Sequence, residues 1–390
     1  MMSNTGTEAC IHTNCGGCAY QGVSYEEQLS LKDAGVRKIL EKSGLLDCEY
    51  LGIDGSSSIY AYRNKMDYTF GDEFKGGETT LGMHRRKSFW SVVTTDSCML
   101  VDSDFNIVLA AVLSFCKEKG YPVYRKKDHV GLLRYLVIRK GMRTNELLIN
   151  IVSSSQGSFD IDELTSRLLS LDLHNKVTGI LHTIDDKLAD FVYCDELRVI
   201  YGNDYYEEEV LSLRFKVHAF SFFQTNVIAA ERLYRTALSW IEHKRAGRAL
   251  DLYCGAGTIT QAIAKSADYA AGVEISPDAV RSARENAGLN ALDNCSFIEG
   301  DVLEVLDGLS ADDFDLITLD PPRVGVHPKA LNKIMKFGAE RILYISCNPQ
   351  SMANDLMILR KDYTIEKIQA FDNFPFTKHV EAAVLLERRL

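Results

Sequence analysis

The sequence predicts an α/β protein with a doubly wound, Rossmann-like sheet in its C-terminal part, and three observations support this class. Strand and helix patterns alternate from residue 225 to the end of the chain, which is typical of a parallel sheet covered by helices on both faces. Residues 61–210 carry mostly short strand patterns with few helices, which indicates an α+β region. A cysteine-rich candidate metal-binding segment precedes both. We therefore expect three parts with the boundaries 1–60, 61–210 and 211–390.

The overall composition is that of an ordinary globular protein, with 46% hydrophobic and 25% charged residues among 390. There is no long apolar run and no secretory signal, so we expect a cytoplasmic protein without membrane association. The net charge of −10 argues against general binding of polyanions. However, residues 61–145 hold 15 Lys and Arg against 9 Asp and Glu, and include Arg85-Arg86-Lys87 and Arg125-Lys126-Lys127. Such runs are solvated surface by default, and a face that contacts phosphates is the functional alternative.

Three cysteines, Cys10, Cys15 and Cys18, lie close together near the N-terminus. The two glycines between Cys15 and Cys18 let the backbone fold tightly, so that several sulfurs can face one point. Cys98 is our candidate for a fourth ligand. Ten cysteines in a chain that is not exported favour thiols and metal ligands over disulfides. Four thiolates suit either structural zinc or an iron–sulfur cluster, and the spacing alone does not choose between them.

The first two parts contain several predicted elements. Residues 24–43 have apolar residues at helical spacing, and Ser24 with Glu27 forms a capping box. Further helices are predicted at 104–120 and 160–171. Strands are predicted at 66–70, 80–84, 91–94, 134–139, 146–152, 178–183, 190–194 and 197–201.

The third part begins with a predicted helix at 225–243. Strands are then predicted at 249–254, 270–275, 295–299, 314–319, 341–346, 364–371 and 380–388, with helices after the first two of them. Asp251-Leu-Tyr-Cys-Gly255-Ala-Gly257 is a glycine turn at the end of the first of these strands. It lacks the third glycine of the dinucleotide fingerprint, which disfavours a nicotinamide cofactor.

Acidic residues follow the next two strands. Glu274 ends the second strand, where a carboxylate can accept both hydroxyls of a ribose. Asp301 follows the third strand and is a candidate contact to an adenine. Together with the glycine turn, these two positions predict a site for S-adenosylmethionine.

Two further strand ends carry candidate chemistry. Cys347 is expected at the carboxyl end of a parallel strand, where a thiol is either a nucleophile or a buried structural cysteine. Asp320-Pro-Pro-Arg323 ends the strand before it, and its prolines fix the backbone where a methyl donor and acceptor would meet. An aromatic residue in place of Arg323 would favour methylation of an amino group, whereas Arg323 with a nearby cysteine favours methylation of carbon.

Methylation of a pyrimidine carbon needs a nucleophile and a base. C5 becomes nucleophilic once a thiolate has added to C6, and the C5 proton must then be removed. Glu381 is our candidate base, with a surface glutamate at the start of a strand as the alternative. The segment before it, residues 371–377, is rich in aromatic side chains, and Phe374 and Phe376 are expected to wall a pocket for a flipped base.

Five ordered motifs together with the N-terminal cysteines resemble the RNA 5-methyluridine methyltransferase family over the whole chain. They are Ser221-Phe-Phe-Gln224-Thr-Asn226, Asp251–Gly257, Leu319-Asp-Pro-Pro-Arg323, Ser346-Cys-Asn-Pro349 and Phe374-Pro-x-Thr-x-His-Val-Glu381. The resemblance implies a class I S-adenosylmethionine-dependent methyltransferase domain at the C-terminus. It also implies that Cys347 is the nucleophile and Glu381 the base.

The resemblance implies ligand sets as well. The residues expected to hold S-adenosylmethionine are Gln224, Tyr253, Glu274 and Asp320, with Thr258 and Asp301 as further candidates. The residues expected to ligate a [4Fe-4S] cluster, as in members that act on ribosomal RNA, are Cys10, Cys15, Cys18 and Cys98.

We expect the substrate to be a uridine of 23S ribosomal RNA, with a transfer RNA uridine as the alternative. An RNA-binding ribosome-assembly factor with a vestigial site and a zinc-binding amino-methyltransferase are the competing classes. Many family members carry an RNA-binding TRAM barrel before the first cysteine, but only nine residues precede Cys10 here, so we expect none. RNA affinity would then come from the central region and the cysteine segment. We expect a monomer without an obligate protein partner.

Overall fold

The computed structural model describes residues 10–45, 47–242, 246–310 and 314–389, and the chain forms two compact units. The first unit comprises Met1–Ser24, Ser58–Glu208 and Val217–Phe220, and the second comprises Tyr25–Ser57, Glu209–Lys216 and Ser221–Leu390. This division differs from the boundaries 1–60, 61–210 and 211–390, because residues 25–57 pack with the C-terminal sheet.

The second unit contains an eight-stranded sheet. Its spatial order is β1 (Glu49–Asp54), β16 (Tyr363–Phe371), β17 (Glu381–Arg388), β15 (Arg341–Ser346), β14 (Leu316–Leu319), β11 (Arg248–Leu252), β12 (Tyr269–Glu274) and β13 (Cys295–Glu299). β17 runs antiparallel to β15 and β16, whereas the remaining neighbours in this order run parallel. The strand order reverses at β11, and open α/β sheets bind ligands at such a switch point.

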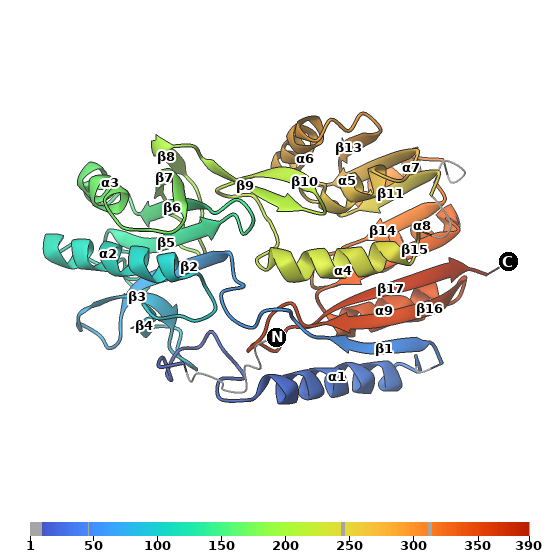
Figure 1. Ribbon diagram of the computed structural model, residues 1–390, viewed down its shortest axis with the longest axis horizontal. Helices are drawn as coiled ribbons and strands as arrows, with labels where there is room; N and C mark the ends of the chain where they lie inside the picture. The colour runs from blue at the N-terminus through green and yellow to red at the C-terminus, as the bar shows by residue number, and fades with distance from the viewer. Residues whose placement is uncertain (1–9, 46, 243–245, 311–313, 390) are drawn as a thin grey trace. The chain divides into compact units, whose positions relative to one another are not determined.

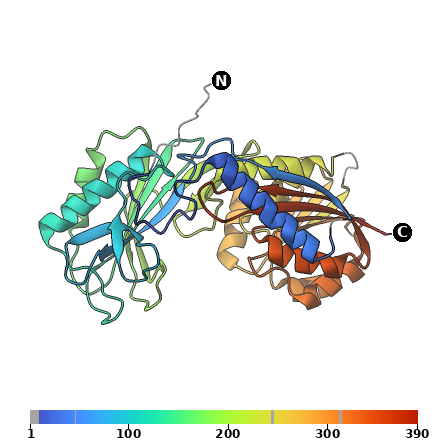
Figure 2. The ribbon, with the colours of Figure 1, turned by 90° about the horizontal axis from the view of Figure 1, so that it is seen from below.

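Helices cover both faces of this sheet, as the sequence predicted (Figure 1). One face carries α1 (Tyr25–Lys42), α7 (Val302–Gly308), α8 (Pro328–Phe337) and α9 (Pro349–Leu359), and α1 contacts both β1 and α9 (Figure 2). Three more helices belong to this unit. In chain order, α4 (Val227–Ser239) precedes β11, α5 (Thr258–Ala264) connects β11 to β12, and α6 (Pro277–Leu289) connects β12 to β13. Among the described residues, no helix combines the length and apolarity needed to cross a bilayer.

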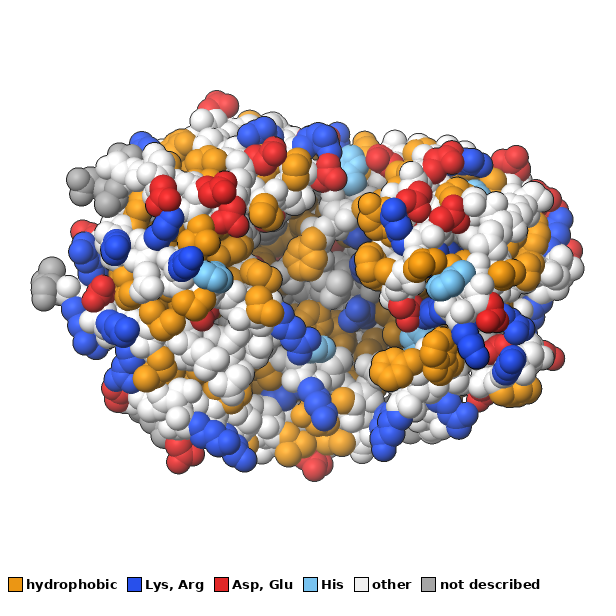
Figure 3. Space-filling model, turned by 180° about the vertical axis from the view of Figure 1, so that it is seen from behind, with side chains coloured by type: hydrophobic (Ala, Val, Ile, Leu, Met, Phe, Trp, Pro, Cys, Tyr) orange, Lys and Arg blue, Asp and Glu red, His pale blue; other side chains and the backbone are white. Residues whose placement is uncertain are grey.

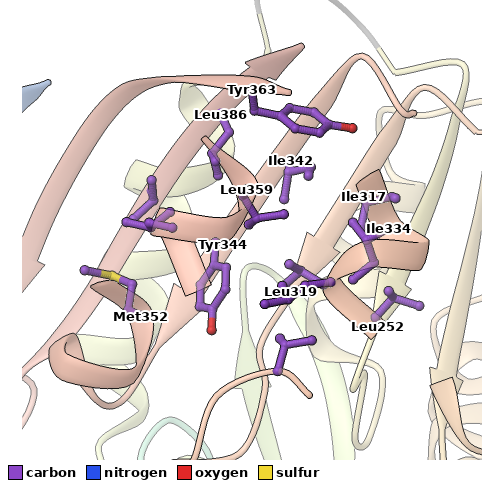
Figure 4. Close-up of a cluster of buried hydrophobic side chains, with 14 of the residues drawn as sticks. Leu252, Ile317, Leu319, Ile334, Ile342, Tyr344, Met352, Leu359, Tyr363 and Leu386 are labelled. Carbon is purple, nitrogen blue, oxygen red and sulfur yellow. The ribbon is translucent and has the colours of Figure 1, made fainter. Parts of the chain in front are cut away.

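The core of the second unit lies between the sheet and the face covered by α1, α7, α8 and α9. Apolar side chains of β11, β12, β14, β15, β16 and β17 converge there with those of α8 and α9, and Figure 4 shows part of this cluster. The labelled members of this core are Leu252, Ile317, Leu319, Ile334, Ile342, Tyr344, Met352, Leu359, Tyr363 and Leu386. Their burial fixes the positions of the strands, and therefore of the residues at the strand ends.

The first unit is built on a seven-stranded sheet. Its order is β4 (Val92–Thr94), β3 (Thr79–His84), β2 (Lys65–Asp72), β5 (Leu133–Lys140), β6 (Glu146–Ser153), β7 (Lys176–Ile184) and β8 (Glu196–Gly202). The helices α2 (Ser103–Lys119) and α3 (Ile161–Leu169) share a core with this sheet. A separate hairpin follows, made of β9 (Tyr205–Val210) and β10 (Leu213–His218).

The sequence prediction missed β1, β9 and β10, and its strand at 190–194 is wrong. Near residues 190–194, backbone groups form hydrogen bonds with side chains instead of with a neighbouring strand. The Arg134 guanidinium donates to the carbonyls of Asp185, Lys187 and Ala189, and the Asp185 carboxylate accepts from the amides of Lys187 and Tyr193. The segment therefore wraps around a buried ion pair instead of joining the sheet.

Candidate active site

The candidate nucleophile, Cys347, follows β15 directly and is half-buried. In the antiparallel ladder between β15 and β17, Ser346 lies opposite Ala382. Cys347 comes directly after Ser346, and Glu381, the first residue of β17, comes directly before Ala382. The antiparallel direction therefore places Cys347 beside Glu381. The two residues that the sequence singled out for covalent chemistry therefore lie side by side at one edge of the sheet.

The thiol and two carboxyls at this edge share one electrostatic environment. Burial, then Glu381 and Asp320, raise the pKa of Cys347 to about 11, while Arg323 opposes this shift. Burial and Asp320 raise the pKa of Glu381 to about 8, again opposed by Arg323. Burial and the neighbouring Asp251 raise the pKa of Asp320 to about 7. The group is acidic and poorly solvated, which favours bound cations and proton transfer near neutral pH.

The turn that carries Cys347 also fixes the Asp-Pro-Pro-Arg loop. Asn348 accepts a hydrogen bond from the Gln350 amide (3.1 Å) and so caps α9. Its side-chain amide donates to the carbonyl of Arg323 (2.9 Å), and the Ser351 hydroxyl donates to the same carbonyl (3.1 Å). The loop after β14 and the turn after β15 are thereby joined, which holds Asp320 and Cys347 in a fixed relation.

Tyr234 on α4 is a buried member of this site that the sequence prediction missed. Its hydroxyl accepts a hydrogen bond from the Gln224 side chain (3.0 Å). Burial, then Asp320 and Glu381, raise the pKa of Tyr234, so its hydroxyl keeps its proton beside the two carboxyls. The apolar spacing of α4 made this tyrosine indistinguishable from a core residue. Gln224, an expected cofactor contact, is thus bonded to a tyrosine that lies within the electrostatic range of both carboxyls.

The glycine turn after β11 has the backbone that its sequence indicated. Tyr253, Gly255 and Gly257 have φ values of +66°, +53° and +78°. A Cβ atom at Gly257 would lie 2.6 Å from the Phe297 ring, so this position requires glycine. A Cβ atom at Gly255 would meet nothing within 4 Å, so open space lies over the turn. A ligand can therefore approach the backbone closely there.

Acidic groups surround this open space. The Glu274 carboxylate accepts hydrogen bonds from the amides of Gly255 (3.1 Å) and Ser276 (2.9 Å), which fixes both of its oxygens at the turn. Burial, then Asp301 and Asp355, raise the pKa of the half-buried Tyr253 to about 12. Asp301 is therefore close to Tyr253, and it also accepts a hydrogen bond from the Leu303 amide as the cap of α7.

These groups fit a ligand with a ribose and a positive charge. Glu274 ends β12, Asp301 follows β13 and Asp320 follows β14, so all three lie at the carboxyl edge, where carboxylates accept from hydroxyls and attract cations. Thr258 is the first residue of α5 and is half-buried beside the glycine turn. Four of the residues predicted to hold the donor, Thr258, Glu274, Asp301 and Asp320, thus lie along one edge of the sheet, and their role in binding it stays a prediction.

Asp251 has a supporting position in the same site. It is buried and accepts hydrogen bonds from the hydroxyls of Thr260 (2.6 Å) and Thr318 (2.5 Å). Burial raises its pKa to about 6, although the two hydroxyls oppose this shift. Asp251 therefore ties α5 to β14 beneath the glycine turn, and its charge acts on Asp320.

The aromatic segment before Glu381 is braced by α1. The buried side chains of Lys32 and Asp372 form an ion pair of 2.7 Å. The Lys32 ammonium also donates to the carbonyl of Phe374 (3.1 Å), and the Phe374 amide donates to Asp372 (3.0 Å). The Phe376 amide donates to the Gln28 side chain (2.7 Å). The predicted helix at 24–43 is present, but its role in holding this loop had no sequence signal.

The two aromatic side chains of this loop differ in exposure. Phe374 is half-buried and packs edge-on against His379, whereas Phe376 is buried with 8% of its surface exposed. Phe376 also has a φ value of +64°, which its backbone contact to α1 holds in place. Of the two side chains expected to wall a base pocket, Phe374 is therefore the one accessible to a ligand.

The four candidate metal ligands, Cys10, Cys15, Cys18 and Cys98, form a second set within the first unit. Burial, then Cys98, Cys15 and Cys10, raise the pKa of Cys18 to about 12. Burial also raises the pKa of Cys98, with further contributions from Cys15 and Cys10. Each of these thiols thus lies within the electrostatic range of the others. Although Cys98 is far from the other three cysteines in the sequence, the fold brings it close to them.

Hydrogen bonds hold the backbone around these thiols. Gln21 donates to the carbonyl of Cys10 (3.2 Å), Arg86 donates to that of Cys18 (2.8 Å), and Asn106 bonds both the amide and the carbonyl of Cys98. In the part of the chain that the structure describes, no group of three or more His, Cys, Asp or Glu side chains has the arrangement of a metal site. The donors fit a thiophilic metal in kind and in proximity, but they are not assembled around one point.

The chain is similar in sequence to known RNA methyltransferases. The sequence model of a family described as tRNA (uracil-5-)-methyltransferase matches residues 193–389. An RNA methyltransferase of Clostridium acetobutylicum is 47% identical over 377 residues, which cover 96% of this chain and 82% of the relative. One from Caldanaerobacter subterraneus subsp. tengcongensis is 47% identical over 381 residues, which cover 97% of this chain and 84% of the relative.

A solved structure is also similar. It is the tRNA (uracil-54, C5)-methyltransferase of Pyrococcus abyssi in complex with S-adenosyl-L-homocysteine. The two proteins are 27% identical with a TM-score of 0.79, over 96% of this chain and 86% of that one. The similarity thus extends over both compact units.

Proposed function

Because this chain belongs to the tRNA (uracil-5-)-methyltransferase family of S-adenosylmethionine-dependent RNA methyltransferases, we propose that it methylates uridine through a covalent bond to Cys347. The observation that carries this proposal is that Cys347 and Glu381 lie at the same end of the β15–β17 ladder, one residue beyond the pair Ser346 and Ala382, where Glu381 and Asp320 both act on the pKa of Cys347. A nucleophile and a base are then available on adjacent strands, where one flipped uracil ring reaches both.

The reaction begins with addition to the uracil ring. The Cys347 thiolate forms a bond to C6, and the electron pair of the C5–C6 double bond moves into the enolate that makes C5 nucleophilic. S-adenosylmethionine supplies a methyl group on a positively charged sulfur. C5 takes this methyl group, and the bonding pair stays with the departing sulfur, which becomes neutral.

Elimination completes the reaction. Glu381 removes the proton from C5, the C5–C6 double bond forms again, and the pair of the C6–S bond returns to Cys347 as the thiolate. A carboxylate with a pKa of about 8 is a stronger base than an ordinary glutamate and suits a proton transfer near neutral pH. The Arg323 side chain opposes the raised pKa of Cys347 and so favours the thiolate.

The methyl donor would be held at the carboxyl edge of the sheet. We assign Glu274 to the ribose hydroxyls and Asp301 to the adenine, with Tyr253 against the adenine as well. Asp320 acts on the pKa of both Cys347 and Tyr234, and Gln224 donates a hydrogen bond to Tyr234. We therefore assign Gln224 and Asp320 to the positively charged end of the donor. Thr258 would contact the donor from the first turn of α5.

We propose a uridine of 23S ribosomal RNA as the substrate, because four thiols gather as the resemblance to ribosomal-RNA members implies. A transfer RNA uridine is the second candidate, favoured by the Pyrococcus abyssi relative, which acts on uracil 54 of transfer RNA. Both unmodified RNAs would be incubated with the enzyme and methyl donor, and the products mapped by mass. A 5-methyluridine in one ribosomal fragment supports the first substrate, and one in transfer RNA alone replaces it by the second. Methylation of neither RNA, with the donor still bound, would favour an assembly factor.

We further propose that Cys10, Cys15, Cys18 and Cys98 hold a [4Fe-4S] cluster. Cys18 is the informative position, because the other three thiols all contribute to its raised pKa. Anaerobically purified protein should contain about four iron and four sulfide per chain, and Cys18→Ser should lose most of both. Cys116→Ser, at a buried cysteine of the same unit outside this set, is the control. Stoichiometric zinc without sulfide would replace the cluster by a structural zinc site.

A further inference from the structure

The loop between β3 and β4 displays two large aromatic side chains to solvent. Phe89 is 82% exposed and Trp90 is 68% exposed. The loop is nevertheless ordered: the Arg85 amide donates to the Ser91 carbonyl (2.8 Å), and the Ser88 hydroxyl oxygen accepts from the amides of Trp90 and Ser91. Residues 85–90 are called the aromatic–basic loop below. Exposed aromatic side chains on an ordered loop are typical of a binding surface.

The cysteine segment supports this loop from one side. The Gly16 amide donates to the His84 carbonyl (2.9 Å), and the Arg86 amide donates to the Asn14 carbonyl (2.8 Å). A Cβ atom at Gly16 would lie 2.8 Å from the same His84 carbonyl, so the close approach requires glycine. The Arg86 guanidinium donates to the Cys18 carbonyl and to Gln21. Arg86 is thus a structural residue, while Lys87, in the same loop as the two aromatic residues, is exposed.

The fold brings a second basic run to the same place. The Lys126 ammonium lies 3.4 Å from the His84 ring, at the point where β3 enters the aromatic–basic loop. Arg125 and Lys127, on either side of Lys126, are exposed. Two acidic side chains moderate this charge: Asp190 pairs with Lys126, and Glu73 lies 4.0 Å from Arg85. Arg125, Lys127 and Lys87 remain available to phosphates.

We propose that this surface binds a single-stranded segment of the RNA substrate, with bases stacked on Phe89 and Trp90 and phosphates on Lys87, Arg125 and Lys127. Aromatic side chains stack with unpaired bases of any sequence, and nearby cations neutralise the backbone. Acidic and basic side chains are mixed over the face drawn in Figure 3, and the net charge is −10, so RNA affinity depends on local surfaces of this kind. The proposal rests on RNA being the substrate.

Trp90 offers a direct test, because the chain has two tryptophans and the other is Trp240. In the full-length Trp240→Phe variant, the fluorescence of Trp90 is recorded while a uridine-rich single-stranded RNA or an RNA duplex of equal length is added. A dye on the RNA reports total binding in the same titration. We expect the single strand to quench Trp90 with the midpoint that the dye reports, and the duplex to leave it unchanged.

Substitutions extend the test. Phe89→Ala should weaken binding of the single strand by about tenfold, a typical loss for one stacked base. Lys127→Gln should lower the slope of log Kd against log salt by about 0.7, the value for one phosphate contact on a single strand. Tyr201→Ala is the matched control, because Tyr201 is an exposed aromatic residue on β8, at the opposite edge of the same sheet.

The outcomes separate this proposal from the function on which it rests. RNA binding and methyl transfer with unquenched Trp90 and an unchanged Kd for Phe89→Ala would overturn the proposed surface and leave the function intact. A change in self-association of Phe89→Ala, without a change in RNA binding, would likewise overturn it in favour of a protein contact. Absence of both RNA binding and methyl transfer with every RNA would overturn both proposals.

Discussion

Cys347 in the second unit and Cys18 in the first both have raised pKa values, but different neighbours contribute to them. Beside burial, the carboxyls of Glu381 and Asp320 raise the pKa of Cys347, and the Arg323 guanidinium opposes them. Beside burial, the pKa of Cys18 is raised by other thiols, with Cys98 first among them. An arginine opposes the raised pKa in both cases, Arg323 at Cys347 and Arg86 at Cys18, so the difference lies in the neighbours that raise it: carboxyls for Cys347 and thiols for Cys18.

This difference indicates what each thiol is suited to do. The protonation of Cys347 depends on the charges of Glu381, Asp320 and Arg323, so a change in their state can favour thiolate formation and release. The thiols around Cys18 lose their protons most favourably together, when a cation replaces them. The first environment suits a covalent intermediate that forms and breaks in each turnover, and the second suits a bound metal.

The largest effect expected from this difference is that of Cys347→Ala. If Cys347 is the nucleophile, as proposed, its removal should lower the rate of methyl transfer by about 10⁴-fold or more, as for covalent catalysts in general. Binding of S-adenosylmethionine, measured by calorimetry, should change little because Cys347 is not among its proposed contacts. Cys48→Ala, at a half-buried cysteine in the same unit, should keep full activity. Normal turnover by Cys347→Ala would remove the distinction between the two kinds of thiol.

The next effect is that of Glu381→Gln. The amide cannot take the C5 proton, so addition and methylation should proceed while elimination stalls. The rate of turnover should fall by about 10²- to 10⁴-fold, the contribution of a general base. A protein–RNA band of higher mass should accumulate on a denaturing gel. The double variant with Cys347→Ala is the control and should give no such band; if Glu381→Gln gives none either, Glu381 is not this base.

A smaller effect on catalysis is expected at Lys32, which acts on the site through the loop that α1 braces. Lys32→Met leaves the Asp372 carboxylate buried without its ion pair, and breaking such a pair costs about 3–5 kcal/mol of stability. The loop leading to Glu381 should lose its fixed position. We expect kcat to fall by about tenfold or more, with a smaller change in KM, because misplacement of a catalytic group lowers the rate of the chemical steps.

The paired variant separates positioning from stability. Lys32→Met with Asp372→Leu removes both charges, which should restore much of the unfolding free energy. Activity should remain low, since the contacts from Lys32 to the Phe374 carbonyl and from Phe374 to Asp372 are still absent. Recovery of kcat in step with stability would mean that Lys32 contributes to folding alone.

Much of the site was predictable because its residues come at the ends of strands with strong apolar patterns. The carboxyl ends of parallel strands meet at one edge, so Glu274, Asp320 and Cys347 could be placed together from strand positions alone. Strand positions alone do not place Glu381 beside Cys347, because this neighbourhood depends on β17 running antiparallel between β15 and β16. The assigned roles of these residues stay predictions.

The missed parts depend on contacts between distant segments. Tyr234 lies on the apolar face of an amphipathic helix, and its polar partner Gln224 is found only in the fold. Lys32 and Asp372 are separated by 340 residues, and a lysine at helical spacing among polar neighbours gives no sign of burial. The strand expected at 190–194 failed because Arg134, far from it in sequence, takes the backbone carbonyls before it.

The smallest predicted effect concerns stability and pH. The native pKa values of Glu381, Asp320 and Asp251, about 8, 7 and 6, lie above the value of about 4 expected for carboxyls in the unfolded chain. The native state therefore binds protons more tightly than the unfolded state, so the free energy of unfolding should fall as pH rises from about 4 to about 8. Denaturant unfolding of the ligand-free protein should give a lower free energy of unfolding at pH 8 than at pH 5.

The source of this loss can be located with single substitutions. Glu381→Gln removes the group with the highest pKa of the three, so the fall in stability between pH 7 and pH 8 should become shallower. Glu304→Gln, at an exposed residue of α7, should leave the profile unchanged. Because the raised pKa values of Glu381 and Asp320 arise from the environment that they share with Cys347, an unchanged profile in Glu381→Gln would mean that this edge is better solvated than its burial indicates. The contrast between the two thiol environments would then lose its electrostatic basis.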